Sequence, residues 1–276
     1  MDAAAAGAAA RPLVVEADLE RRFGGVRRLY GEAGYQRLRH AHVAVVGLGG
    51  VGSWAVEALA RSGVAALTLI DLDHLSESNI NRQLQALEGT LGMAKALALR
   101  ERIAQIHPLC KVHAVEAFVE AGNWPGLLQG HVVDGVIDAC DQVRAKQAIA
   151  EWSLASRVPV VCAGAAGGKR AAQRVEVADL SDVTHDPLLA ALRQRLRKAG
   201  AARSGAIGLR CVFSRETVVR PDAAACDAND PPTDGSLNCH GYGSSVAVTA
   251  TFGMVAAGEL MQRIAAAAEK RADARC

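Results

Sequence analysis

A short glycine-rich segment has the residue types and spacing of a phosphate-binding loop. Gly47-Leu48-Gly49-Gly50-Val51-Gly52 follows the apolar, β-branched run 42–46 and precedes a stretch, 53–61, whose apolar residues suit one side of a helix. Glycines let the backbone approach a phosphate closely, and the free N–H groups at a helix start face its negative charge. The loop therefore predicts nucleotide binding. The alternative is a tight strand–helix turn that holds no ligand.

Acidic residues follow this loop at the distance expected for a ribose contact. Asp71 comes directly after the apolar run 65–70, about 20 residues past the loop, and Asp73 lies two residues further on. A carboxylate at the end of the second strand can accept hydrogen bonds from ribose hydroxyls. The expected nucleotide-binding residues of this βαβ unit are Gly47, Gly49, Gly50, Gly52, Asp71 and Asp73.

The residues after the acids indicate a triphosphate rather than a nicotinamide. Asn79, Arg82, Gln83 and Lys95 lie just past the ribose acid, where a dehydrogenase has no use for them. Arginine binds phosphate as a planar fork with several donors, and lysine binds it as a point charge. We therefore expect these four residues to contact a triphosphate that is attacked at its α-phosphorus.

Two more acids end another apolar run. Asp138 closes the run 132–138, and Asp141 follows three residues later. In a doubly wound sheet, ligands bind at the carboxyl ends of the strands. Two carboxylates that face a triphosphate there suit a Mg²⁺ ion held largely by substrate oxygens. The alternative for Asp141 is the N-cap of a helix over 142–152.

In this order, the motifs resemble those of the adenylating enzymes related to ubiquitin activation, the ThiF/MoeB/HesA superfamily. The shared pattern is GxGGxG, acid-x-acid, N-x-x-R-Q, G-x-x-K and D-x-x-D, all present here. Within that superfamily, residues 19–260 resemble the bacterial tRNA threonylcarbamoyladenosine dehydratase family. The segments that carry this closer resemblance are 22–25, 29–31, 49–54, 178–180, 186–188, Arg193, 196–198, 211–214 and 249–253.

The resemblance implies an activity. In this family, ATP adenylates the carboxylate of threonylcarbamoyladenosine beside the tRNA anticodon, and ring closure with loss of AMP completes a dehydration. The resemblance implies ATP and Mg²⁺ as cofactors and tRNA as a partner, with a cysteine desulfurase or sulfur-acceptor system as a further candidate partner. The residues implied for catalysis are Arg22, Arg82, Lys95 and Asp141.

The resemblance also implies a homodimer in which an arginine crosses to the nucleotide of the neighbouring subunit. Arg22, just before Phe23-Gly24-Gly25, is the position that matches, and Arg21 is its competitor. A solvated N-terminal helix over 20–35 is the alternative for this basic segment.

Two other functions remain open. One is activation of the C-terminus of a small sulfur-carrier protein at the same site, although the chain lacks the C-x-x-C pairs of most such activators. The other is a non-enzymatic sulfur relay or scaffold with an exposed thiol such as Cys239, beside His240. We expect no catalytic cysteine, because ring closure on the bound nucleoside supplies an internal nucleophile.

Composition and periodicity predict an α/β fold. Half of the 276 residues are hydrophobic and only 4% are aromatic, so Ala, Val and Leu must build the core. We expect a Rossmann-like, doubly wound and mostly parallel sheet, followed by a smaller α+β substrate and dimerisation region. The expected parts are a disordered tail over 1–18, an ATP-binding half over 19–163 and the smaller region over 164–276. The boundary is soft, and one single domain remains an alternative.

Charge and polarity differ along the second half of the chain. The net charge of +2 does not by itself indicate nucleic acid, but residues 169–220 hold 11 Lys and Arg against 5 Asp and Glu. This bias predicts phosphate contacts with a nucleic acid, or else a solvated face. Residues 235–258 carry no charge, yet their Gly, Ser, Thr and Asn favour a buried helix, at a dimer interface, over a membrane span.

Two further features concern the thiols and a second glycine-rich loop. Seven cysteines, an odd number without a C-x-x-C pair, predict reduced thiols in a cytoplasm. Residues 164–169 form the second loop, with Ala165-Ala166 before Gly167-Gly168. Its expected role is a floor close to substrate or a tight connection between strands.

Overall fold

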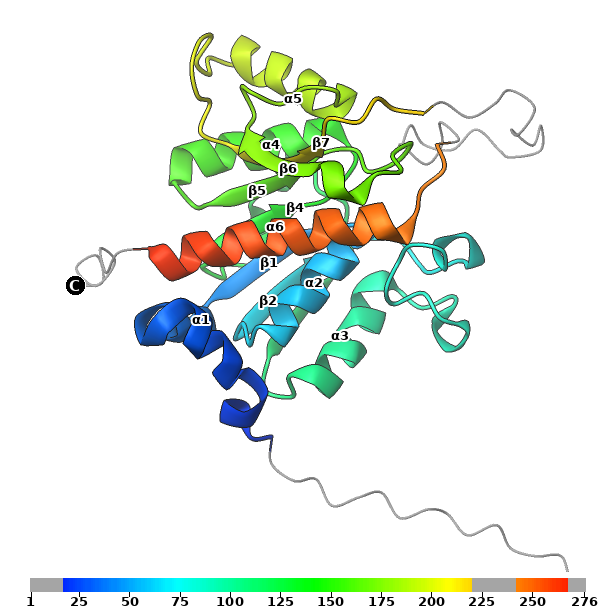
Figure 1. Cartoon of the computed structure of the whole chain (residues 1–276), viewed down its shortest axis with the longest axis vertical. Helices are drawn as coiled ribbons and strands as arrows, with labels where there is room; N and C mark the ends of the chain where they lie inside the picture. The colour runs from blue at the N-terminus through cyan, green and yellow to red at the C-terminus, as the bar shows by residue number, and fades with distance from the viewer. Residues whose placement is uncertain (1–16, 220–241, 268–276) are drawn as a thin grey trace, which may run out of the picture.

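The centre of the molecule is one seven-stranded sheet in the order β3-β2-β1-β4-β5-β7-β6 (Figure 1). The computed structural model describes residues 17–219 and 242–267. All neighbouring strands run parallel except β6 and β7, so the expected mostly parallel, doubly wound sheet is confirmed. The strands are β1 (His42–Val46), β2 (Ala66–Ile70), β3 (Lys111–Val115), β4 (Gly135–Asp138), β5 (Val160–Ala163), β6 (Val175–Asp179) and β7 (Arg210–Ser214).

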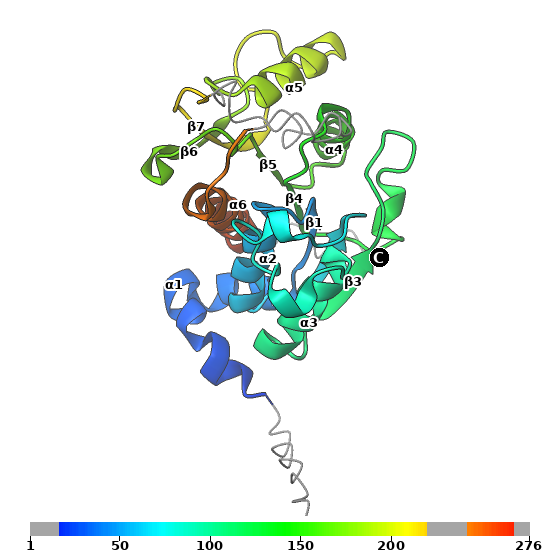
Figure 2. The ribbon, with the colours of Figure 1, turned by 90° about the vertical axis from the view of Figure 1, so that its right-hand side faces the viewer.

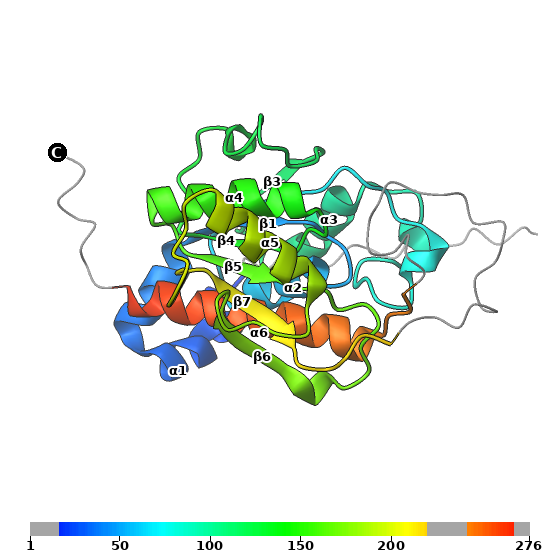
Figure 3. The same cartoon turned by 90° about the horizontal axis from the view of Figure 1, so that it is seen from above.

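Helices cover both faces of this sheet (Figures 2 and 3). One face carries α1 (Leu19–His40), α2 (Gly52–Arg61), α3 (Lys95–Ile106) and α6 (Val246–Ala266), and the other carries α4 (Val143–Ser156) and α5 (Pro187–Lys198). The short 3-10 turns are η1 (Glu77–Asn79), η2 (Glu88–Thr90), η3 (Gly126–Leu128) and η4 (Ala172–Arg174). Two separate apolar layers, one on each face, therefore hold the sheet in place.

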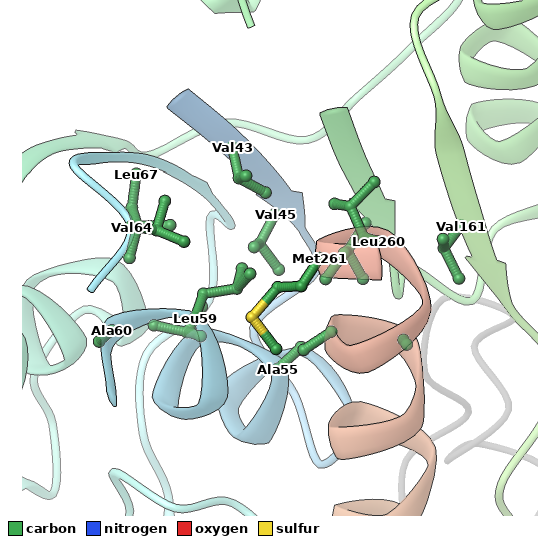
Figure 4. Close-up of a cluster of buried hydrophobic side chains, with 14 of the residues drawn as sticks. Val43, Val45, Ala55, Leu59, Ala60, Val64, Leu67, Val161, Leu260 and Met261 are labelled. Atoms are coloured by element: carbon green, nitrogen blue, oxygen red, sulfur yellow. The ribbon is translucent and has the colours of Figure 1, made fainter. Parts of the chain in front are cut away.

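The layer beneath α2 and α6 is built from small aliphatic side chains, as the low aromatic content requires. Figure 4 shows Val45 of β1 and Leu59 of α2 packed beside Leu260 of α6, and all three are fully buried. Gly253 lets α6 lie directly on α2, because a Cβ there would come within 2.3 Å of the Val51 carbonyl oxygen. The uncharged C-terminal stretch thus contains a buried helix, as expected. Its place at a dimer interface stays a prediction.

The sheet continues across the expected boundary at residue 164. β5 pairs with β7 beyond that position, and α6 from the end of the chain packs on α2 from its first half. The division into two functional halves stays a prediction. Residues 1–16 of the expected tail and the acidic stretch 227–234 lie outside the described residues. Within the described ranges, no helix has the length and apolar character that crossing a membrane would require.

Candidate active site

A pocket lies at the carboxyl ends of the central strands. β1 lies between β2 and β4. The connection from β1 to β2 contains α2, which lies on one face of the sheet, and β4 is followed by α4, which lies on the other face. Ligands bind at such a switch point in open α/β sheets. The predicted residues that the structure brings together in the pocket lining are Gly47, Gly49, Gly50, Asp71, Asp73, Arg82, Gln83, Lys95 and Asp141.

The glycine loop forms a backbone cradle at one side of this pocket. Gly47 has a φ of 81°, and a Cβ on it would come within 2.7 Å of the Cys140 backbone nitrogen. Gly52 lies behind the lining, where a Cβ would come within 1.8 Å of the Gly47 carbonyl oxygen. Val51, which caps α2, makes no side-chain capping hydrogen bond in the described structure, and the Ser53 N–H donates to the Gly49 carbonyl at 3.1 Å. The positive end of the α2 dipole is therefore directed at this loop without a capping side chain over it, which suits an anion.

Asp71 is held rigidly between the loop and Lys95. It is 9% exposed, and it accepts hydrogen bonds from the backbone N–H of Leu48 at 2.6 Å and of Asp73 at 2.9 Å. The Lys95 ammonium lies 2.6 Å from the Asp73 carboxylate and 4.0 Å from that of Asp71. Burial raises the pKa of Asp71, and the neighbouring Lys95 opposes that rise. The arrangement fixes a carboxylate where ribose hydroxyls can donate to it.

The segment that carries Arg82 and Gln83 is anchored to the start of α2. The Trp54 indole donates to the Arg82 carbonyl at 3.0 Å. Asn79 lies outside the pocket lining, and its carbonyl accepts from the backbone N–H of Arg82 and of Gln83. Asn79 therefore shapes the loop that presents Arg82 and Gln83 to the pocket.

Gln83 contains an unpaired acceptor in the pocket wall. The residue is 5% exposed, and its Oε1 finds no hydrogen-bond partner among the residues that the structure describes. Buried polar atoms in folded proteins nearly always have a partner. A donor on a bound ligand, such as a hydroxyl or an amino group, would satisfy this oxygen.

Asp138 does not join the other predicted residues in the pocket. Its carboxylate is 1% exposed and forms an ion pair with the fully buried Lys146, whose Nζ lies 3.1 Å from Oδ1. The thiols of Cys140 and Cys162 donate to the two carboxylate oxygens at 2.9 and 3.3 Å. The backbone N–H of Cys140 also donates to Oδ1, at 3.2 Å, so the carboxylate has four donors of its own outside the pocket lining. A metal contact of Asp138 stays a prediction. The sequence feature that could have indicated this ion pair is Lys146, eight residues after Asp138 at the end of its strand.

Asp141 does line the pocket, at the carboxyl end of β4. Gln142 rather than Asp141 caps α4, so the N-cap alternative for Asp141 is wrong. In the part of the chain that the structure describes, no cluster of three or more His, Cys, Asp or Glu could hold a metal ion. One carboxylate combined with substrate phosphate oxygens is nevertheless a common Mg²⁺ environment. The donor set fits an ion that arrives with the nucleotide.

Arg22 lies at the far end of α3 from the pocket. Its guanidinium donates to the carbonyl of Ile106, the last residue of α3, at 2.6 Å. Lys95 begins α3 inside the pocket, and a helix of 12 residues is about 17 Å long. Arg21 is engaged in the first turn of α1, 3.9 Å from Asp18. Arg22 could therefore act at a pocket of this kind only in another copy of the chain.

Residues 164–167 of the second glycine loop line the pocket, as the first of the two roles expected for this loop requires. Further pocket residues were not predicted from the sequence. These residues follow β3, begin α5, precede α6 or lie in its first turn, and they are Phe118, Leu188, Tyr242, Ser244 and Thr249. Chemically bland residues far apart in the chain carry no local signal that they meet.

Two of the described thiols, Cys140 and Cys162, are poor nucleophiles. Burial, reinforced by the Asp138 carboxylate, raises the pKa of Cys140 well above its ordinary value, and hydrogen bonding with Cys211 together with burial does the same for Cys162. A protonated thiol is unreactive. Cys226, Cys239 and Cys276 lie outside the described residues.

Comparison with known proteins identifies the family. The model of the ThiF family matches residues 23–275. The chain is 41% identical over 268 residues to the tRNA threonylcarbamoyladenosine dehydratase of Escherichia coli (strain K12), covering 94% of this chain and 99% of that protein. It is 39% identical over 251 residues to the protein of that name from Haemophilus influenzae, covering 89% and 94%. The crystal structure of the E. coli enzyme in complex with ATP is similar with a TM-score of 0.79 at 41% identity, covering 91% of this chain and 97% of that one. The chain belongs to the ThiF family and, within it, to the tRNA threonylcarbamoyladenosine dehydratases.

Proposed function

We propose that this protein uses ATP to dehydrate threonylcarbamoyladenosine in tRNA by adenylating the threonyl carboxylate. One observation carries the proposal: the glycine loop, the buried Asp71 and the cations Arg82 and Lys95 meet at the switch point of the sheet. The chain that contains this site matches a dehydratase over nearly its whole length. Release of pyrophosphate and AMP tests it. Both products should appear only with tRNA that carries the modified nucleoside. Release that instead depends on a small carrier protein would support the sulfur-carrier alternative.

The chemistry has two steps. A carboxylate is a poor electrophile because its leaving group would be oxide, so a carboxylate oxygen first attacks the α-phosphorus and displaces pyrophosphate. The carbamoyl group of the same nucleoside then attacks the activated carbonyl carbon, loses a proton and releases AMP as the ring closes. The net change is loss of water from the nucleoside. Because the nucleophile belongs to the same molecule, proximity contributes much of the rate and no protein nucleophile is needed.

The residues of the pocket stabilise charge and hold the substrates in place. The amides at the start of α2, with Arg82 and Lys95, neutralise the triphosphate, and Asp71 accepts from the ribose. Asp141 would hold Mg²⁺, which when bound supplies further positive charge to the phosphate oxygens. Fixed dipoles and charges of this kind act on the charge that develops at the phosphorus during attack.

The basic helix α5 contributes to tRNA binding in this proposal. Arg193 donates to the carbonyls of Leu180 at 3.1 Å and Val183 at 2.7 Å, so its guanidinium supports the fold. Arg195, Arg197 and Lys198 follow it on the same helix and supply positive charge for the phosphate backbone. With a tRNA substrate, we infer a cytoplasmic location for the enzyme. A cysteine desulfurase or sulfur-acceptor partner stays a prediction.

Arg22 completes the neighbouring site of a homodimer in this proposal. Arg22→Ala and Lys95→Ala should each be inactive alone, because each removes a cation from every site. Mixed and re-associated, the two variants form heterodimers in which one site carries both changes and the other carries neither. Turnover should recover to about a quarter of the wild-type value, because half of the dimers then hold one intact site.

The complementation experiment measures tRNA cyclisation in the mixture and in each variant alone. Arg21→Ala is the matched control, since Arg21 pairs with Asp18, the N-cap residue of its own helix. Full activity of Arg22→Ala alone, or no recovery on mixing despite heterodimers shown by mass spectrometry, would contradict the shared site.

Thiols should take no part in catalysis. Cys140→Ser keeps a donor for the Asp138 carboxylate and should turn over tRNA close to the wild-type rate, as should Cys239→Ser. The measurement is cyclisation, with ATP and tRNA binding determined separately. Loss of cyclisation with both binding steps intact would show that a thiol participates, and direct ring closure would then be wrong.

A further inference from the structure

The pocket extends past the nucleotide-binding residues along the carboxyl ends of β4 and β5. Asp71 follows β2, on one side of the glycine loop, and Phe118 follows β3 beyond it. A nucleotide whose ribose meets Asp71 has its base on the β3 side, and its phosphates reach back to the loop after β1. The opposite side of the pocket, beyond Asp141, remains for the group that attacks.

That opposite side has its own wall, which we call the acceptor wall and define as residues 164–168. Leu188 from α5 and Tyr242 from the segment before α6 stand beside it in the pocket lining. We propose that this side is the acceptor subsite, which receives the modified nucleoside of the tRNA, and that Lys169 is the positioning residue that fixes its wall. The inference rests on the proposed function and assigns the half of the pocket that the nucleotide leaves open.

Lys169 joins three separate segments behind the acceptor wall. It is 2% exposed, and its ammonium donates to the carbonyl oxygens of His185 at 3.1 Å, Ser214 at 2.9 Å and Glu216 at 3.1 Å. Three acceptors satisfy all three ammonium protons. His185 has a φ of 58°, a left-handed conformation that is uncommon outside glycine and frequent at functional sites. The lysine thus holds the loop after β5 against the start of α5 and the end of β7.

A buried carboxylate fixes the other end of the acceptor wall. Asp186 is 3% exposed, and it accepts from the backbone N–H of Ala165 at 2.8 Å and of Leu189 at 2.9 Å. Gly164 permits this approach, because a Cβ on it would come within 2.1 Å of the carboxylate. The same side chain therefore caps α5 and orients the wall.

The far end of the wall is bound to the chain beside Tyr242. The Gly168 N–H donates to the Gly243 carbonyl at 2.8 Å, and the Val219 N–H donates to the Gly168 carbonyl at 2.8 Å. A Cβ on Gly168 would come within 3.3 Å of the Tyr242 ring. The wall and the aromatic side chain are consequently held against each other.

The chemistry of this surface suits a nucleoside that has left its base stack. Enzymes that act on a nucleobase bind it between aromatic and apolar side chains, which Tyr242 and Leu188 provide. Small residues at 164–167 leave room for the threonylcarbamoyl arm to reach the α-phosphate. A buried ammonium and a buried carboxylate are costly to desolvate. In this protein the hydrogen bonds of Lys169 and Asp186 offset that cost and hold the acceptor wall in one conformation.

Two variants test the acceptor subsite. Leu188→Trp enlarges a half-buried side chain in the pocket lining. Lys169→Met removes the three N–H donors of the ammonium while it keeps a side chain of similar length. Both should bind ATP with wild-type affinity in the absence of tRNA, while kcat/KM for tRNA falls by about 100-fold. Lys169→Arg keeps the charge and donors and should recover part of that loss. Lys111→Met is the matched control, because Lys111 is exposed at the opposite end of the sheet.

The outcomes separate this inference from the proposed function. A wild-type protein that binds ATP but does not cyclise tRNA would refute the proposed function. Given an active wild type, unchanged tRNA kinetics in Leu188→Trp would overturn the acceptor subsite, and so would a parallel loss of ATP affinity in that variant. If Lys169→Met does not fold, Leu188→Trp still tests the location of the subsite. Lys169→Arg then tests the role of the lysine, because a lowered kcat/KM for tRNA at unchanged ATP affinity would support a positioning role, and unchanged values of both would contradict it.

Discussion

Replacing Arg82 or Lys95 with alanine should lower kcat for tRNA by about 100-fold or more while the chain stays folded. Each change removes a charge-assisted donor from the anion that forms at the α-phosphorus, and one such donor typically contributes ~3 kcal/mol. Lys95→Ala has a second effect, because Lys95 is the cation that opposes protonation of the buried Asp71. The pKa of Asp71 should then rise further, and ATP affinity should fall more steeply as the pH is lowered than it does in the wild type.

The measurement is single-turnover cyclisation at saturating tRNA, with circular dichroism to monitor folding. Lys111→Ala, which removes an exposed lysine from β3 at the opposite end of the sheet, should retain wild-type kcat. Near-normal turnover in both Arg82→Ala and Lys95→Ala would show that the phosphates bind elsewhere.

Lys146→Met should lower the free energy of unfolding by about 3–5 kcal/mol, a large part of the stability of an ordinary domain. The change leaves the Asp138 carboxylate buried without its cation, 3.1 Å from where the ammonium stood. Unfolding in urea measures the loss. The double variant Lys146→Met with Asp138→Leu should regain most of it, because a buried ion pair is replaceable by apolar residues of similar volume.

A stability within about 1 kcal/mol of wild type for Lys146→Met would contradict the assignment of a buried ion pair. The double variant also bears on the site. If Asp138 is a support below the pocket, that variant should still bind ATP. If Asp138 is a metal ligand, Mg²⁺-dependent ATP binding should disappear even though the stability is restored.

The sequence was most informative where the chemistry is local. The run from His42 to Asp71 contains a strand, a glycine loop, a helix and a second strand in immediate succession, and β1, α2 and β2 lie within one residue of the expected positions. Asp71, Arg82, Gln83 and Lys95 converge because the strand ends and the loop after β2 must meet at one edge of a parallel sheet.

Long-range features were beyond the reach of sequence patterns. β7 lies between β5 and β6 although it follows both in the chain, and no local periodicity encodes that order. Asp138 was expected to bind metal because of its position at a strand end, and the sequence did not indicate that a lysine in the first turn of α4 is directed back to it. Tyr242 and Leu188 reach the pocket only through tertiary packing.

The fate of one oxygen atom tests adenylation of the carboxylate most directly. The substrate is tRNA whose threonylcarbamoyladenosine carries a heavy oxygen isotope in both carboxylate positions, and the products of one turnover are analysed by mass spectrometry. If the carboxylate attacks the α-phosphorus and the carbamoyl group then displaces AMP, each AMP must contain one heavy oxygen and pyrophosphate must contain none. Unlabelled AMP, with the isotope found in inorganic phosphate or in water, would contradict the account.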